Sequence, residues 1–365
     1  MNRTDAIAWV VTVWAQLRLS QAKTLGELVA AALHVGRVSL AALGRQLAGQ
    51  TATKHRIKRT WRFVANPRVA VGDAMHGVVG RLVKRRKKPL LVGFDWTELR
   101  GFCTLMAAAV LKGRAIPLVW ASYPKGVLCK SQNNLEEGLL RVLRTMIPEG
   151  VAVILLADRG LGRSELARTC QFLGFHYVVR IRPDVWIEHP DFRGKLLDYP
   201  VQRGLCQLLA NVQYRKHKPV CQHVVVRWKI GLPEKRDEPW FLMTDLRRPP
   251  IALSELYAQR MTIEELFRDG KSRRNGYALR ATQLTRAERI DRLLLILALA
   301  YILLVGLGLR ARRRYRPGAW RSSNRPRECS AFTIGRIMLE RMKLRAVSAF
   351  AAAIAATVEV APKWG

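Results

Sequence analysis

The chain has 365 residues, of which 63 are Lys or Arg and 27 are Asp or Glu, so its formal net charge is +36. Its hydrophobic content of 49% excludes a disordered basic tail, and its length suggests about two or three domains. A protein this basic is expected to work against a polyanion, and nucleic acid is the default partner because neutralised phosphates release counterions. A merely basic surface that follows an Arg-rich coding bias is the alternative.

The cysteines and the first apolar segment bear on the compartment. The 6 cysteines are scattered without a C-x-x-C pair, which indicates a reducing cytosol and neither a zinc site nor a disulfide framework. His217, Cys221 and His223 are close in sequence, but they lie on a Lys-rich, strand-like stretch that favours an incidental role. Residues 7–15 are apolar, but the preceding Asp5 and the amphipathic pattern that follows argue against a signal peptide.

Residues 1–88 are predicted to form a helical domain. Apolar positions recur at spacings of three and four residues, and the segment holds 17 basic and 3 acidic residues. The run KHRIKRTWRF (54–63) suits a helix that lies along DNA phosphates, with Lys54, Arg56, Lys58 and Arg59 as contacts and an aromatic underside. An ordinary solvated helix face is the alternative. The second run, RLVKRRKK (81–88), is interpreted as a basic linker.

From Pro89 the pattern changes to strands. Short apolar runs at 90–97, 102–113 and 114–123 predict a meander, and 133–147 has helical spacing. The near-continuous apolar run 151–158 predicts a strand covered on both faces, followed by a helix at 163–174 and a strand at 176–182. The order β-β-β-α-β-α-β predicts a mixed five-stranded α/β sheet in which a crossover helix places the fourth strand beside the first.

The rest of the chain contains an insertion, a long helix, an apolar run and a basic tail. Residues 183–239, rich in Pro, Lys and Arg, are interpreted as a β-rich insertion, and 240–245 returns to a helix at 254–272. The 17-residue apolar run 293–309 is short for a membrane span and favours a buried helix in a domain ending near residue 310. Residues 311–365 are expected to form a basic, helical C-terminal region.

Two aspartates mark the ends of apolar runs. Asp95 follows LLVGF, and Asp158 follows VAVILLA on the strand predicted to lie beside it. Burying two nearby carboxylates is costly, and a divalent cation with oxygen ligands is the usual solution. Each aspartate alone would be interpreted as a strand-end cap or a turn residue, so the metal interpretation rests on the pair.

The helix predicted at 254–272 adds a third carboxylate. Tyr257, Arg260, Glu264 and Lys271 follow the spacing Y-x2-R-x3-E-x6-K. On one helix they fall within a stripe roughly 60° wide, so a carboxylate is flanked by two cations and a phenol. Such a face could hold a metal while Arg and Lys hold phosphates on either side. An exposed helix with ordinary ion pairs has the same composition.

This arrangement resembles the DDE transposases of bacterial insertion sequences, in the insertion-sequence-four type that carries the same signature. FDWT (94–97), ADRG (157–160), the order of elements and the insertion before the Glu264 helix extend the resemblance over about residues 54–310. It implies a ribonuclease-H-like catalytic domain at 89–310 with Asp95, Asp158 and Glu264 as catalytic metal ligands. It also implies that residues 1–88 bind the terminal inverted repeats of the element.

The resemblance also implies a chemistry. Two Mg²⁺ ions, for which Mn²⁺ can substitute, would be held with Asp95 shared and Asp158 and Glu264 on one ion each. Water would free a 3′-OH at the element end, and that hydroxyl would attack target DNA or the opposite strand, giving a hairpin. Tyr257, Arg260 and Lys271 would grip phosphates, and Trp240, or else Trp228, would receive an unstacked base. A core tryptophan is the alternative for both rings.

The expected partner is therefore double-stranded DNA, as transposon ends and target, bound by a homodimer in the bacterial cytoplasm with no membrane contact. Three other classes stay open on the sequence. They are an inactive or repurposed DNA-binding protein of the same fold, a membrane-anchored basic protein, and a ribonuclease or resolvase-type nuclease.

Overall fold

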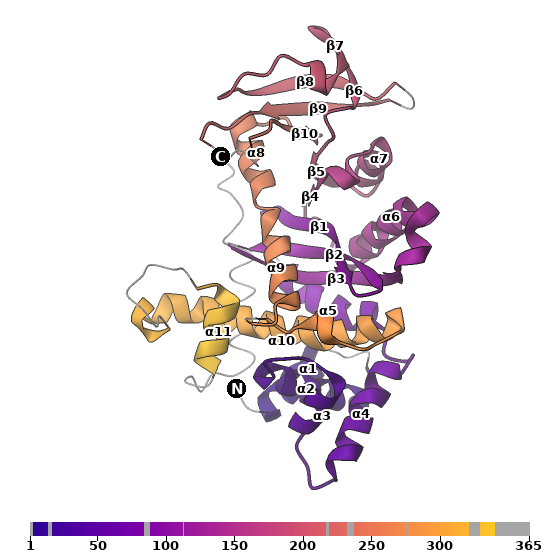
Figure 1. Ribbon diagram of the computed structural model, residues 1–365, viewed down its shortest axis with the longest axis vertical. Coiled ribbons are helices and arrows are strands. Elements are labelled where there is room, and N and C mark those ends of the chain that lie inside the picture. Colours follow the sequence, from indigo (N-terminus) through magenta and orange to yellow (C-terminus); the bar gives the residue numbers. More distant parts are fainter. Residues whose placement is uncertain are drawn as a thin grey trace.

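The computed structural model describes residues 3–13, 17–83, 88–111, 113–216, 219–231, 237–274, 276–320 and 329–339. A long sheet runs through the molecule, and helix α10 (Ala287–Arg314) crosses below it (Figure 1). Most of the N-terminal helices lie on the far side of α10 from the sheet, and the last of them lies beside the sheet (Figure 1). These N-terminal helices are α1 (Arg3–Val13), α2 (Leu19–His34), α3 (Leu40–Gln46), α4 (Thr53–Ala65) and α5 (Val71–Val83).

The first five strands form the mixed sheet that the sequence predicts. They are β1 (Leu90–Leu99), β2 (Phe102–Leu111), β3 (Arg114–Pro124), β4 (Val153–Ala157) and β5 (Phe175–Arg180). Their order is β3-β2-β1-β4-β5, and β4 pairs in parallel with both β1 and β5. The crossover helix α6 (Leu128–Met146) places β4 beside β1, as expected, and α7 (Ser164–Phe172) connects β4 to β5. This is the strand order of the ribonuclease-H-like fold.

The insertion extends this sheet. Its strands are β6 (Trp186–His189), β7 (Phe192–Lys195), β8 (Cys206–Tyr214) and β9 (Val220–Arg227), and β10 (Trp240–Thr244) follows it. Because β10 pairs antiparallel with both β5 and β9, the sheet continues from five strands to ten in the described residues. Pairing covers the β5 edge, which would otherwise present unpaired backbone groups.

Helices cover the two faces of the sheet. In Figure 1, α6 and α7 lie on one face, and α8 (Pro250–Ala258) and α9 (Met261–Lys271) lie on the other. The helix predicted at 254–272 is therefore two helices. Between Leu256 and Ile263 the backbone makes hydrogen bonds of the i→i+3 type, from Gln259, Arg260, Thr262 and Ile263, so the chain turns between α8 and α9.

The apolar run 293–309 forms the centre of α10. Among the described residues α10 is the one helix long and apolar enough to cross a membrane, and 89% of its most apolar window is buried inside the protein. This burial supports the interpretation of residues 293–309 as a buried helix rather than a membrane span. Close contacts with α11 (Ala331–Leu339) fit this, since a Cβ on Gly308 would lie 1.8 Å from the Ala331 carbonyl oxygen.

The N-terminal helices pack onto α10. Helices α2, α4 and α5 contact it, and one hydrophobic cluster joins these helices to α10 and to the sheet. The domain boundaries at residues 88 and 310 stay predictions, and α10 itself continues to Arg314. Most of the predicted linker (84–87), His217, and residues 321–328 and 340–365 of the C-terminal region lie outside the described residues.

Candidate active site

The sheet register brings Asp95 and Asp158 together. In the parallel pairing of β1 with β4, Phe94 lies opposite Ala157, so the two aspartates are the next residues on neighbouring strands. Asp95 still belongs to β1, whereas Asp158 is the first residue after β4. Both side chains lie at the edge to which the carboxyl ends of parallel strands point, the usual place for a site in an α/β sheet.

Glu264 reaches the same place from α9. This helix packs against β1 at Gly93, where an added Cβ would lie 3.2 Å from the Cβ of Ile263. A glycine at this point lets the helix approach the strand closely, and Glu264 follows Ile263 directly. The structure thus brings together all three predicted carboxylates, from β1, from the end of β4 and from α9.

Arg260 lies among these carboxylates. Its Nη1 donates to Asp95 Oδ2 at 3.2 Å and its Nη2 donates to Glu264 Oε1 at 2.5 Å. Tyr257 donates from its hydroxyl to Asp158 Oδ1 at 3.2 Å. Arg260 is 6% exposed, so its charge is largely removed from water. The turn between α8 and α9 therefore still directs both signature residues toward the acidic cluster, although they do not share one straight helix.

Burial and charge set the protonation of the site. Burial raises the pKa of Asp95 to about 6, the Arg260 charge and the Trp96 backbone N–H oppose that rise, and Asp158 and Glu264 add to it. Burial also raises the pKa of Tyr257 far above its ordinary value, which keeps its hydroxyl neutral. For Arg260, burial lowers the pKa, but the surrounding acidic groups outweigh it and the net shift is upward. The guanidinium therefore stays charged.

The donor set fits a hard divalent cation. All three side chains offer carboxylate oxygens, the ligands that Mg²⁺ and Mn²⁺ prefer, and a cationic group already lies between two of them. Within the described part of the chain, no three His, Cys, Asp or Glu side chains are grouped closely enough for a single ion.

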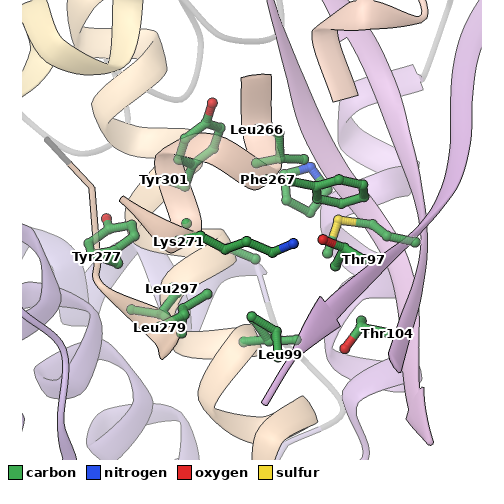
Figure 2. Close-up of a pocket in the computed structure, with 15 residues that line it drawn as sticks. Thr97, Leu99, Thr104, Leu266, Phe267, Lys271, Tyr277, Leu279, Leu297 and Tyr301 are labelled. Atoms are coloured by element: carbon green, nitrogen blue, oxygen red, sulfur yellow. The ribbon is translucent and has the colours of Figure 1, made fainter. Parts of the chain in front are cut away.

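Lys271, the last residue of α9, lies between a cleft and a cavity. The open cleft of about 660 Å³ is also lined by Asp95, Glu264 and Arg280. A cavity of about 60 Å³ lies behind α9, and Figure 2 shows the Lys271 side chain crossing it between Leu279 and Thr97. Burial lowers the pKa of Lys271, and Arg280 lowers it further. The lysine stem is thus held against apolar side chains beside the acidic cluster.

Arg280 is a cleft residue that the sequence analysis missed. It is exposed, and it belongs to a short 3-10 helix, Leu279–Ala281, that follows α9. The loop before it is folded back on α9, because Tyr277 N–H donates to the Asp269 carbonyl at 3.0 Å. A single basic residue in an irregular loop carries no periodic signal, so the sequence offered no way to select it.

The two tryptophans occupy different surroundings. Trp240 is half-buried and meets the Tyr257 ring edge-on, with centroids 5.3 Å apart and the Lys229 amino group 4.9 Å from its ring centroid. Trp228 lines a cavity of about 330 Å³ together with Arg159 and Arg180. Of its lining residues, Arg159 directly follows Asp158 in the chain.

The four basic residues predicted to contact DNA lie on α4, away from the carboxylates. Lys54 and Lys58 are exposed. Arg56 donates to the Leu47 carbonyl at 2.7 Å, and Arg59 forms an ion pair with Glu27 at 2.7 Å. The two lysines thus face solvent, whereas the two arginines have partners within the N-terminal helices.

Comparison with known families agrees with this geometry. Residues 123–303 match the family model of the transposase DDE domain. The match includes Asp158, Glu264 and the whole Tyr257–Lys271 signature, and it begins after Asp95. No curated protein matches the chain. The match supports a DDE transposase, an enzyme of the nuclease type whose substrate is DNA.

Proposed function

We propose that this transposase binds the terminal inverted repeats of a bacterial insertion sequence and cuts and joins DNA at Asp95, Asp158 and Glu264. One observation carries the proposal. Three carboxylates gather within a ribonuclease-H-like sheet, from β1, from the end of β4 and from α9. Asp95 and Glu264 accept from the buried Arg260 guanidinium, and Asp158 accepts from the Tyr257 hydroxyl. A fold used only to bind DNA would not need three carboxylates gathered against the repulsion of a phosphate backbone.

The carboxylates would hold two Mg²⁺ ions, with Asp95 shared and Asp158 and Glu264 on one ion each. When bound, such ions activate an attacking oxygen and stabilise the leaving oxygen of a phosphodiester. Hydrolysis would add water across the P–O3′ bond, leaving a 3′-OH and a 5′-phosphate. That hydroxyl would then attack a phosphodiester of a second strand, forming a new P–O bond and releasing the 3′-OH of that strand. No protein–DNA covalent bond forms, and Tyr257, whose hydroxyl stays neutral, is no nucleophile.

The remaining signature residues would position DNA. Lys271 and Arg280 line the cleft beside Asp95 and Glu264, where their charges can hold phosphates on either side of the reacting group. Arg260 would exchange its carboxylate partners for phosphate as DNA and metal enter. Tyr257, which donates to Asp158, would orient that carboxylate and contact the backbone.

A hairpin route would require a place for an unstacked base. Trp240 is the residue that the sequence favours, and its position against Tyr257 keeps it beside the site. The cavity lined by Trp228, Arg159 and Arg180 supports Trp228 as the alternative, because it offers an aromatic wall and two cations for the attached phosphate. Pairing of two element ends would require a homodimer on DNA, in the cytoplasm.

The test is metal-dependent cleavage of duplexes that carry the DNA ends flanking this gene. We expect nicking at the end with Mg²⁺ or Mn²⁺ and none with EDTA. Asp158→Ala should abolish nicking while DNA binding survives, and Asp191→Ala, at an exposed turn, should leave nicking unchanged. Tight binding without cleavage under either metal would favour an inactive DNA-binding protein instead.

A further inference from the structure

A buried ion pair lies on the face of the sheet opposite Arg260. Glu136, in α6, is fully buried at 0% exposure, and Arg163, which precedes α7, is 7% exposed. The Arg163 guanidinium donates to Glu136 Oε2, and its second arm reaches the Asn133 carbonyl at 3.4 Å. The other carboxylate oxygen of Glu136 accepts from Trp96 Nε1 at 2.7 Å and from Gln132 Nε2 at 3.0 Å.

Two of the partners of Glu136, Trp96 and Arg163, are each tied to one candidate ligand. Trp96 follows Asp95 in β1, and its backbone N–H donates to Asp95 Oδ1 at 2.8 Å. Arg163 ends the turn that begins at Asp158, in which Leu161 N–H donates to the Asp158 carbonyl and Arg163 N–H donates to the Leu161 carbonyl, both at 2.9 Å. One carboxylate thus holds the segment after each aspartate.

The hydrogen bonds around Glu136 lie on the opposite face of the sheet from Tyr257 and Glu264. Helices α6 and α7 cover one face of the sheet, whereas α8 and α9, which carry Tyr257 and Glu264, cover the other (Figure 1). The Glu136 carboxylate is enclosed, so it cannot touch a substrate. Its contribution to the reaction can be made only through the positions of Asp95 and Asp158.

A buried ion pair is a costly way to fill a core, since apolar residues of the same volume are often as stabilising. Its advantage is directional, because a carboxylate that bonds Trp96 through one oxygen and Arg163 through the other fixes both segments at set distances. Metal ligands generally need such support, since small displacements of a ligand weaken the site.

We propose that Glu136, with Arg163 and Trp96, is a positioning residue that sets the spacing of Asp95 and Asp158 for divalent-metal binding. The inference rests on the proposed function, because it assigns the two aspartates as metal ligands. It concerns residues outside the signature and on the opposite face of the sheet from it.

The test measures Mn²⁺ binding to the DNA-free protein by calorimetry and the Mn²⁺ dependence of end cleavage. Glu136→Gln keeps the shape and removes the charge. We expect the Mn²⁺ concentration for half-maximal cleavage, and the calorimetric Kd, to rise roughly 10- to 100-fold. Trp96→Phe keeps an aromatic ring, although a smaller one, and removes the Nε1 donor. It should shift both values in the same direction, so it provides a second test if Glu136→Gln does not fold.

The neighbouring glutamate supplies a matched control. Glu137 lies on the same helix and pairs loosely with Arg141 at 3.8 Å, so Glu137→Gln should leave both Mn²⁺ values unchanged. A purely structural role for Glu136 would lower the thermal midpoint and the amount of active protein while the folded fraction kept its Mn²⁺ affinity. If the wild-type protein binds Mn²⁺ and cleaves DNA, that result would overturn the role of Glu136 and leave the proposed function standing. A wild-type protein that neither binds Mn²⁺ nor cleaves would overturn the proposed function, and this inference with it.

Discussion

Among the described residues, Arg260 is the only basic side chain that forms ion pairs with two of the three candidate ligands, Asp95 and Glu264. Its charge is permanent, and its planar fork can bind two carboxylates at once. In this state it lowers the repulsion between acidic groups that burial has already made unfavourable, as the raised pKa of Asp95 shows. A divalent cation that binds the same oxygens must compete with it.

This competition predicts the behaviour of Arg260→Ala. We expect Mn²⁺ to bind the DNA-free variant more tightly than the wild type, by about tenfold, because roughly 1.4 kcal/mol of competing interaction is removed. Calorimetric titration measures this, and Arg141→Ala, on exposed α6 surface, is the control. Cleavage of DNA by the variant should still fall, because a phosphate contact is lost. Weaker Mn²⁺ binding would instead mean that Arg260 holds the carboxylates in place.

At the scale of elements, the contact between α9 and β1 determines where Glu264 lies. The helix rests on Gly93, where no side chain keeps the Ile263 Cβ away from the strand. Interiors are close-packed, so even one added methyl group at such a contact moves the neighbour. Glu264 is one residue from the contact on the helix, and Asp95 is two residues from it on the strand.

Gly93→Val should therefore displace α9 and weaken cleavage. We expect the cleavage rate to fall at least tenfold, with a loss of about 1–3 kcal/mol in the free energy of unfolding from overpacking. Rate assays and chemical denaturation measure the two effects. Gly101→Ala is the control, because a Cβ at this hairpin turn would meet nothing within 4 Å. Equal rates for Gly93→Val and wild type would show that Glu264 tolerates a shifted helix.

The sequence predicted the elements whose signal is local. The apolar runs before Asp95 and Asp158 gave β1 and β4, and crossover topology placed them side by side, as observed. Tyr257 and Arg260 of the signature bond to the aspartates, although the turn at Arg260 was not expected. The Asp95 that Arg260 contacts is 165 residues away in the chain.

The features that the sequence did not indicate depend on contacts between residues far apart in the chain. Glu136 bonds to Trp96 across 40 residues and to Arg163 across 27, so neither spacing forms a recognisable motif. Glu136 even sits beside Glu137 in an ordinary helical pattern, and only burial distinguishes the two. The insertion was predicted as β-rich, but its continuity with the main sheet depends on which strand edge is free, a property of the assembled sheet.

At the scale of the whole molecule, α10 links the basic N-terminal helices to the sheet. Arg292 donates to the carbonyls of Val69 and Val64, at 3.1 and 3.2 Å, near the end of α4. The adjacent Asp291 accepts from the Ser122 backbone N–H of β3 at 3.3 Å. A DNA end held on α4 would therefore be held in a fixed relation to β3 and, through β2, to β1.

The net charge of +36 leads to a prediction about which basic residues contact DNA phosphates. Lys54 and Lys58 are exposed on α4, whereas Arg56 and Arg59 already have internal partners. Each phosphate contact contributes about −0.9 to the slope of log K against log salt concentration, so Lys54→Ala with Lys58→Ala should reduce that slope by about 1.8. Fluorescence anisotropy over a salt series measures it, with Lys195→Ala, at the far edge of the sheet, as the control. An unchanged slope would mean that the element end binds elsewhere than α4, because lost phosphate contacts must appear in the counterion release whatever the DNA sequence.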